Sequence, residues 1–138
     1  MTQTSLDHQA LLDTALDAAT RAAKIAEDFR HGASLDVKLK AARNLVTAAD
    51  VAAEQAIIAT IRERHPSHHY LAEESAADGH SQEHLHGPLW IIDPIDGTTN
   101  YAQGLNHVGI SIAFAVSGQV EVGVVQAPFL DLTFSAIR

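Results

Sequence analysis

One stretch, WIIDPIDGTTN at positions 90–100, most constrains how this chain can fold. It begins with three apolar residues and ends in glycine, two threonines and asparagine, and the aspartates Asp93 and Asp96 lie between these parts on either side of a Pro-Ile pair. A short apolar run followed by proline and glycine predicts a buried strand that stops abruptly. The two carboxylates are therefore expected where the strand breaks, at the mouth of the fold, which is a place to hold a cation.

Length and composition restrict the class of protein. A chain of 138 residues is long enough to bury a core in one domain, and 46% hydrophobic with 19% charged residues is typical of a soluble globular protein. No run of ~18 apolar residues occurs, so no membrane span is expected. The polar amino terminus does not resemble a secretory signal. The absence of cysteine excludes disulfides and thiolate metal sites and fits a cytoplasmic location.

The formal net charge of -8 restricts the partners. Such a surface repels nucleic acid and anionic lipid unless its basic residues cluster, so neither nucleic acid nor membrane is expected as a partner. An acidic protein that handles an anionic substrate would need a metal to offset the repulsion.

Hydrophobic periodicity predicts two helices before the central stretch. Apolar residues recur at steps of three and four over 5–30, and Gly32 is a plausible stop. A second helix over 47–64 would begin at Thr47, where Thr47-x-x-Asp50 has the form of a capping box. Asp50 is then expected in the first turn, and capping alone would explain its presence.

Strands are expected in the rest of the chain. Residues 108–116 alternate between large and small side chains, and the small face could let a helix approach closely. A turn at Ser117-Gly118-Gln119 predicts an antiparallel return over 120–125. The remaining strands are expected over 70–72 and 132–137. The last of these would present an unpaired edge, which suggests that a further element is missing.

Three carboxylates, Glu73, Asp93 and Asp96, are candidates for a metal site at the strand ends. Without a cysteine or a clear histidine partner they favour a hard cation with oxygen ligands, Mg2+ or Mn2+. The carbonyl of Ile95 lies between the two aspartates and could add another oxygen ligand. Pro94 fixes the local backbone and removes one N–H.

Residues 97–99 suggest an anion seat beside the metal. If Gly97-Thr98-Thr99 opens a helical turn, its N–H groups can bind an anion. A metal next to such a seat is the layout for phosphate ester hydrolysis, because the ion polarises phosphoryl oxygens and lowers the pKa of a bound water. Thr98 could orient that water, with Asp50 as the candidate proton acceptor.

Each feature taken alone has a simpler structural explanation. A D-x-x-D pair near proline and glycine is often a turn with side-chain hydrogen bonds. The pair Glu73-Glu74 alone is explained as solvated, and Thr98-Thr99 alone as a helix cap. Only their conjunction favours metal-assisted phosphate chemistry.

The histidines are a competing metal-site hypothesis. Six of the nine lie between His65 and His86, and clustered histidines can bind Zn2+ or Ni2+. They occupy a polar region with no supporting pattern behind them, so the carboxylates are favoured over them. His107 precedes a strand and is assigned a structural role.

At this point three motifs resemble one family. WIIDPIDGTTNY at 90–101 is similar to the central signature of the inositol monophosphatase family of metal-dependent, lithium-sensitive phosphatases. LAEES at 71–75 resembles the family's Gly-Glu-Glu-Ser motif, with Ala72 in the glycine place. NLVTAAD at 44–50 resembles its Asp-Leu-Val-Thr-x-x-Asp segment, with Asn44 in place of the first aspartate.

The resemblance implies a set of metal ligands. Glu73, Asp93 and the Ile95 carbonyl would hold a first Mg2+, with Mn2+ possible and Li+ expected to inhibit. Asp93 and Asp96 would share a second ion. A lysine before the Asp50 segment, either Lys38 or Lys40, would lie near an additional metal and the substrate.

The resemblance also implies roles in catalysis. Thr98 with Asp50 would activate the attacking water, while Glu74 would support Thr98 or a metal ligand. The implied catalytic residues are Thr98, Asp50 and Glu73. The implied phosphate-binding residues are Gly97, Thr98 and Asp96.

The fold implied is α+β, an antiparallel sheet packed with two amino-terminal helices, as in the first half of the family's αβαβα sandwich. Residues 1–138 would form a single, incomplete domain, because family members are about twice as long. Their second half carries a Trp-Asp motif that completes the second metal site. Here the one tryptophan, Trp90, is followed by Ile91, so that ligand is missing.

The function expected is Mg2+-dependent phosphomonoester hydrolysis of inositol or sugar phosphates, weak or absent in this chain alone. One alternative is an inactive metal-binding or interaction remnant. Another is a phosphatase for bisphosphorylated nucleotides or sugars. A homodimer is expected from the family's habit, the small-residue face and the open edge.

Overall fold

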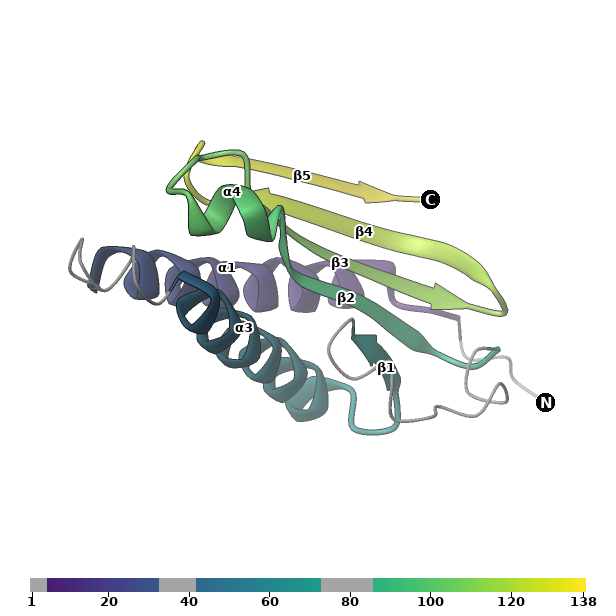
Figure 1. Cartoon of the computed structure of the whole chain (residues 1–138). Helices are drawn as coiled ribbons and strands as arrows, with labels where there is room; N and C mark the ends of the chain where they lie inside the picture. The colour runs from purple at the N-terminus through teal and green to yellow at the C-terminus, as the bar shows by residue number, and fades with distance from the viewer. Residues whose placement is uncertain (1–4, 33–41, 73–85) are drawn as a thin grey trace.

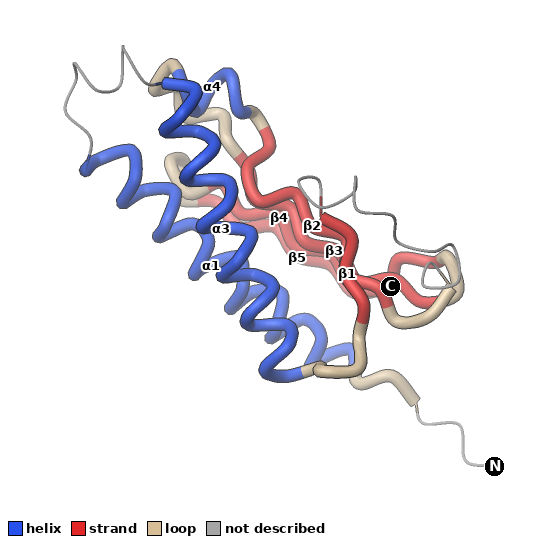
Figure 2. The backbone as a smooth tube through the Cα atoms, turned by 60° about the horizontal axis from the view of Figure 1, so that its bottom comes forward, coloured by secondary structure: helices blue, strands red, loops and turns tan. Residues whose placement is uncertain are grey.

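The computed structural model describes residues 5–32, 42–72 and 86–138, and these form a twisted sheet with two long helices on one of its faces (Figures 1 and 2). The chain order is α1 (His8–Gly32), α3 (Ala42–Arg64), β1 (His69–Ala72), β2 (Leu89–Asp96), α4 (Thr98–Ala102), β3 (Gly109–Val116), β4 (Gln119–Ala127) and β5 (Leu132–Ile137). Among these described residues, no helix combines the length and apolarity that crossing a membrane requires.

The sheet has the strand order β1-β2-β3-β4-β5. The α+β class is confirmed, but the sheet is mixed and not wholly antiparallel as expected, because β1 pairs with β2 in parallel. The later pairs are all antiparallel. A parallel pair needs a crossover of about a dozen residues or more. The chain between Ala72 and Leu89 has that length.

Helix α1 buries a stripe of small residues and ends at Gly32, where the sequence predicted a stop. Its buried alanines let α3 and the sheet approach closely, and Figure 2 shows α1 and α3 side by side on the same face. The buried residues of this stripe are Leu11, Ala15, Ala18, Ala19, Ala22, Ala23 and Ala26.

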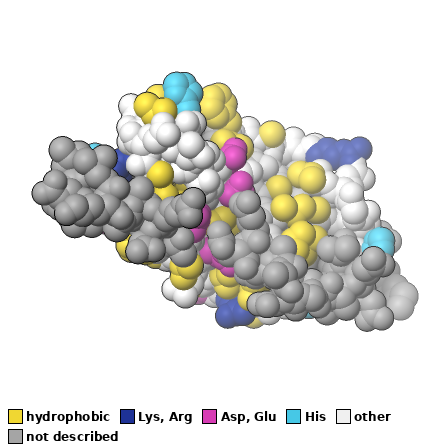
Figure 3. All heavy atoms as spheres, viewed as in Figure 1, with side chains coloured by type: hydrophobic (Ala, Val, Ile, Leu, Met, Phe, Trp, Pro, Cys, Tyr) yellow, Lys and Arg dark blue, Asp and Glu magenta, His cyan; other side chains and the backbone are white. Residues whose placement is uncertain are grey.

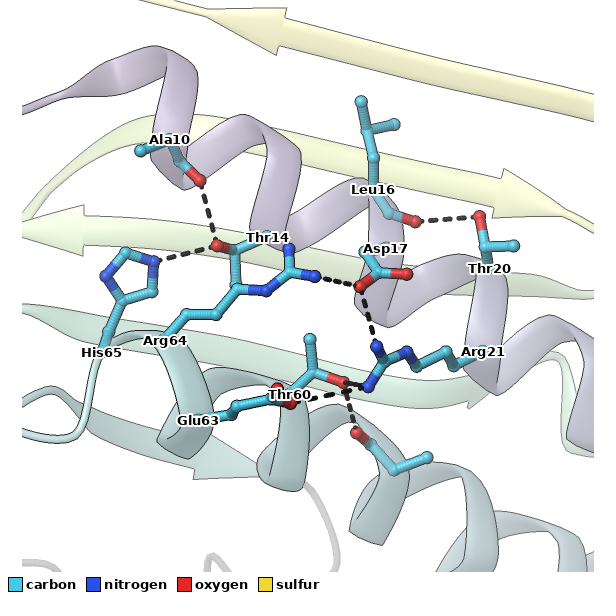
Figure 4. A network of polar contacts seen from close by, with 11 residues as sticks. Ala10, Thr14, Leu16, Asp17, Thr20, Arg21, Thr60, Glu63, Arg64 and His65 are labelled. Carbon is cyan, nitrogen blue, oxygen red and sulfur yellow. Dashed lines mark hydrogen bonds and ion pairs between the residues drawn. The ribbon is translucent and has the colours of Figure 1, made fainter.

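Polar contacts also join the two long helices (Figure 4). Asp17 of α1 accepts a hydrogen bond from Arg64 of α3 and is paired with Arg21 of α1 at 3.1 Å. Arg21 in turn donates to the hydroxyl of Thr60 at 3.2 Å. The Arg64–Asp17 and Arg21–Thr60 contacts thus link α1 to α3.

Helix α3 begins at Ala42, five residues before the predicted start. The expectation that Thr47 caps the helix was therefore wrong, and Asp50 lies well inside the helix and not in its first turn. The residues before Thr47 include alanine, arginine and leucine, which favour helix, so the helix continues through a sequence that has the form of a cap.

Strand β2 also runs further than expected. It continues through both aspartates to Asp96, and the register with β3 shifts between Asp93 and Asp96. Pro94 has no N–H to donate to a neighbouring strand. The proline thus makes an irregularity within the strand, where a stop had been predicted.

The β3–β4 hairpin turns at Ser117 and Gly118, which have φ angles of 54° and 75°. Two positive φ angles are typical of a two-residue turn that matches the strand twist. The large face of β3 packs against the helices, with Ile110, Ile112 and Phe114 fully buried. The small face of β3 could have let a helix approach, but the described helices cover the large face. Burying the bulky side chains of that face removes more apolar surface from water.

Candidate active site

The candidate site lies where β2 ends and α4 begins. Asp93 is half-buried opposite Ser111, and Asp96 is exposed opposite Gly109. The side chain of Ile95 is buried in a small core cluster with Ala49, Ala26, Tyr101 and Val108. The cluster anchors the segment between the two aspartates to α1, α3 and α4, so the carboxylates project from a backbone that is held in place.

The parallel register of β1 and β2 brings two predicted ligand segments together. Ala72 pairs with Ile92. Ala72 directly precedes Glu73 in the chain, and Ile92 directly precedes Asp93. The backbone positions that lead into these carboxylates are therefore neighbours, although they are 20 residues apart in sequence. Glu73 and Glu74 lie outside the described residues, as do Lys38 and Lys40.

Gly97 makes the turn from β2 into α4. Its φ is +92°, in the left-handed region, and a Cβ atom there would lie 2.8 Å from the carbonyl oxygen of His107. The Tyr101 N–H donates to the Gly97 carbonyl at 2.9 Å and closes the first turn of α4. The helical turn predicted at Gly97-Thr98-Thr99 is confirmed, and Thr98 is exposed at its start.

Asn100 ties the turn to the chain that follows α4. Its Nδ2 donates to the His107 carbonyl at 2.9 Å, the same oxygen that approaches Gly97 so closely. The predicted structural role of His107 is thus partly carried by its backbone.

Asp50 reaches the site from α3. It is 5% exposed, and its charge acts on Tyr101 of α4. Burial raises the pKa of Tyr101 to about 12; the Arg30 charge opposes this shift and the Asp50 charge adds to it. The structure therefore brings Asp50 to α4, the helix that begins with Thr98. Its action together with Thr98 stays a prediction.

A further buried carboxylate, Glu54, was missed from the sequence. It lies one turn after Asp50 on α3 and is 7% exposed. The available signal was the spacing, because residues four apart share one face of a helix.

The histidines nearest the sheet belong to an aromatic cluster. The rings of His65 and His68 stack with centroids 4.8 Å apart, and Trp90 Nε1 donates to His68 Nδ1 at 3.1 Å. His65 Nε2 is hydrogen bonded to the Thr14 hydroxyl at 2.9 Å (Figure 4). Within the described ranges no three His, Cys, Asp or Glu side chains group closely enough to hold a metal ion. His80 and His84 lie outside these ranges.

The charge around the site is negative. Figure 3 shows acidic side chains gathered between the α4 end of this face and an apolar area over the strands. Carboxylates and carbonyls are the donors that hard divalent cations prefer. The described part of the donor set, Asp93, Asp96 and the Ile95 carbonyl, therefore suits Mg2+ or Mn2+ better than a softer metal.

Comparisons with known proteins match this chain to one family. A sequence model of the inositol monophosphatase family matches residues 7–138. "Nus factor SuhB" of Pasteurella multocida is 40% identical over 129 residues, which are 93% of this chain and 47% of that protein. "Inositol monophosphatase 1" of Sus scrofa is 38% identical over 128 residues, 92% of this chain and 46% of that protein.

Solved structures agree with this similarity. The inositol monophosphatase from Anabaena (Nostoc) sp. PCC 7120 superposes with a TM-score of 0.78 at 35% identity, over 96% of this chain and 45% of that one. The chain thus spans about half the length of the relatives it matches.

Proposed function

The chain belongs to the inositol monophosphatase family, and from this premise we propose that it carries the metal and phosphate half of a Mg2+-dependent phosphomonoesterase for inositol or sugar phosphates. The β1–β2 register carries the proposal. It aligns the residue before Glu73 with the residue before Asp93 at the edge where α4 begins. An arrangement of this kind can converge oxygen ligands from two strands on one ion.

Each part of the site has a proposed role. Glu73, Asp93 and the Ile95 carbonyl would hold one Mg2+, and Asp93 with Asp96 would share a second. The ion supplies a Lewis acid that lowers the pKa of a water and polarises phosphoryl oxygens. Glu74 would support this ligand set.

The chain's own residues would position the phosphate and the water. Gly97 and Thr98 are the cap and the first residue of α4, so their backbone N–H groups lie at its amino end, where an anion is favoured. Thr98 would orient the attacking water, and Asp50 would accept its proton. Lys38 or Lys40 would lie near the substrate.

We expect weak or no turnover from these 138 residues alone, because the relatives are about twice as long. Phosphate transfer depends on holding reactants in place, and half of the polypeptide present in the relatives is not in this sequence. The second candidate function is metal binding or interaction without turnover. The similarity to a protein named as a Nus factor supports this second candidate function.

Mg2+ binding measured by calorimetry tests the first step. The Asp93→Asn variant should bind Mg2+ more weakly by at least about tenfold. Mutating a residue that only hydrogen-bonds to a metal ligand already lowers metal affinity about 10–100-fold. Asp131→Asn is the matched control, because Asp131 is an exposed acid between β4 and β5. The metal proposal is wrong if the unaltered chain binds no Mg2+, or if both variants bind equally.

Phosphate release from the same samples separates the functions. Inositol monophosphate, a sugar phosphate and a bisphosphorylated nucleotide should each be assayed with Mg2+ and with Mn2+. Release above the metal-only background would rule out the inactive remnant, and the preferred substrate would decide between the two phosphatase hypotheses. Li+ should suppress any release.

A second copy of this chain is the proposed partner. Strand β5, LTFSAI, is exposed along its whole length at the edge of the sheet and contains no charged residue or proline. Edges are usually protected by such residues. Two β5 strands related by a two-fold axis would pair antiparallel and join two sheets into one.

Sedimentation velocity at micromolar concentration tests the dimer. The chain should sediment as a dimer, and Phe134→Lys, which puts a charge on β5, should sediment as a monomer. Val51→Lys is the control, since Val51 is a 41% exposed apolar residue on α3. A clean monomer of the unaltered chain would contradict the proposal.

We also propose a cytoplasmic location, from the lack of cysteine.

A further inference from the structure

Arg30, in the last turn of α1, is the one buried cation among the described residues, with 6% of its surface exposed. Its Nη2 donates to the carbonyl oxygens of Tyr101 at 2.8 Å and Leu105 at 3.0 Å, and lies 3.5 Å from that of Asn100. All three acceptors belong to α4 or to the residues just after it. Arg30 therefore binds the carboxyl end of α4.

Two aromatic rings hold the guanidinium in place. Its Cζ lies 3.8 Å from the ring centre of Phe129 and 4.7 Å from that of Tyr101. Phe129 comes from the segment between β4 and β5, so three parts of the chain meet at this one side chain. Arginine suits the position because its planar fork can stack on rings while it donates to several carbonyls.

Tyr101 makes a second attachment to the same helix. Its hydroxyl donates to the Ala26 carbonyl of α1 at 2.8 Å. Helix α4 has five residues, too few to be stable by itself. The Tyr101 and Asn100 carbonyls already accept the Gly104 and Leu105 N–H groups at 3.2 Å and 2.8 Å, so the contacts with α1 add further hydrogen bonds that attach α4 to that helix.

Burying the Arg30 charge costs free energy, so apolar packing alone does not explain why an arginine stands at this position. Arg30 Nε and Nη1 are buried without a hydrogen-bond acceptor. Burial lowers the pKa of Arg30, although arginine keeps its proton in proteins. A buried charge is often no more stabilising than an apolar residue of similar volume. An apolar residue cannot donate hydrogen bonds to the carbonyls at the end of α4.

The other end of α4 carries the proposed phosphate contacts, Gly97 and Thr98. We infer that Arg30 is a positioning residue that holds α4, and so the N–H groups of Gly97 and Thr98, in register with the carboxylates of β2. The inference rests on the proposed function for its phosphate step. Its structural step, the immobilisation of α4, can be measured separately.

Amide hydrogen exchange by NMR tests the structural step in the full chain. Arg30→Met should speed exchange of the Tyr101, Gln103 and Leu105 amides roughly ten- to hundredfold, the factor that losing hydrogen bonds from a charged donor implies. Amides of β3 and β4 should change far less. Arg30→Lys, which keeps a charge but not the fork, should fall between the two.

Arg62→Met is the matched control. Arg62 also stacks on a tyrosine, 5.3 Å from the Tyr70 ring, and donates to the Tyr70 hydroxyl at 2.7 Å, but it lies on α3 near β1. It should leave the α4 amides unchanged. Equal loss of protection throughout the chain in Arg30→Met, or unchanged α4 amides, would overturn the inference. If Arg30→Met does not fold, the Arg30→Lys and Arg62→Met pair decides by the same readout.

Titration with inorganic phosphate and Mg2+ tests the phosphate step. The Gly97 and Thr98 amide resonances of the unaltered chain should shift, and reaching half of that shift in Arg30→Lys should take several times more phosphate. If the unaltered chain shows no shift, the proposed phosphate contact fails, while the exchange result still decides the role of Arg30. Equal affinity of both proteins, with α4 loosened in Arg30→Lys, would contradict the link between Arg30 and the phosphate seat.

Discussion

The two faces of the sheet are made by the same strands and differ in what covers them. On the face toward α1 and α3, Trp90, Ile112 and Phe114 are fully buried. On the opposite face, Ile91 is 39% and Phe134 is 61% exposed. Alternate residues of one strand therefore have opposite environments, as the pleat requires.

The open face is apolar, although it is exposed. It has a shallow hollow of about 280 Å3 lined by small and apolar residues. Figure 3 shows this apolar area over the strands, beside the acidic side chains. The residues that line the hollow include Ser111, Ala113, Gly123, Val125, Phe134 and Ala136.

The largest effect should come from the covered face. Phe114→Ala should lower the free energy of unfolding by about 3–5 kcal/mol, because it removes a fully buried ring and leaves a cavity. Urea denaturation measures this. A loss below about 1 kcal/mol would mean that the helices do not pack on this face as described.

A smaller effect is expected at Gly97, where the sheet passes into α4. Gly97→Ala should cost about 1–3 kcal/mol of stability, from the positive φ and from the close approach of the His107 carbonyl. Gly104→Ala is the control, because Gly104 has a φ of +76° but open space around its Cβ position. Equal losses in the two variants would show that the close approach contributes nothing.

The aromatic cluster of His65, His68 and Trp90 should make the stability of the chain depend on pH. Burial, with the Arg64 charge, lowers the pKa of His65; burial, with His65 and His69, lowers that of His68. The unfolded chain, with histidine pKa values of about 6.5, takes up protons first as the pH falls. The Tm should therefore be constant just above pH 6.5 and fall progressively below it, toward the lowered pKa values.

Calorimetry at a series of pH values checks this slope. His68→Gln keeps an acceptor for Trp90 without a titrating group, so the slope below pH 6.5 should be shallower. A slope that is the same in His68→Gln and in the unaltered chain would mean that another group causes it.

The smallest effect should come from the open face. Phe134→Ala should change the stability of the monomer by no more than about 0.5 kcal/mol, as at other exposed sites. The comparison with Phe114→Ala keeps the residue type constant and changes only the face. A loss as large as that of Phe114→Ala, measured at concentrations where the chain is monomeric, would show that the open face is covered in solution.

Local sequence signals were sufficient for most elements. Helix α1, the end of α3 at Arg64, the hairpin at Ser117-Gly118 and strand β5 follow from periodicity, turn chemistry and breakers. The motif around Asp93 and Asp96 also indicates the family. Such features depend on neighbours in sequence, which the chain itself displays.

Element boundaries were less predictable where local signals compete. The capping pattern at Thr47 lies inside α3, and Pro94 interrupts β2 without ending it. At Thr47 the helix-favouring residues before it outweigh the cap pattern. At Pro94 the burial of Ile92 and Ile95 outweighs the loss of one ladder hydrogen bond.

Thus the sequence by itself determined the family, the α+β class and the residues from which the site is proposed. Only the tertiary structure decided that β1 runs parallel to β2, that the large face of β3 is the covered one, and that Arg30 reaches α4 across 71 positions to Tyr101. The physical reason is that these facts depend on contacts between distant segments. Periodicity and spacing report only the few residues on either side of each position.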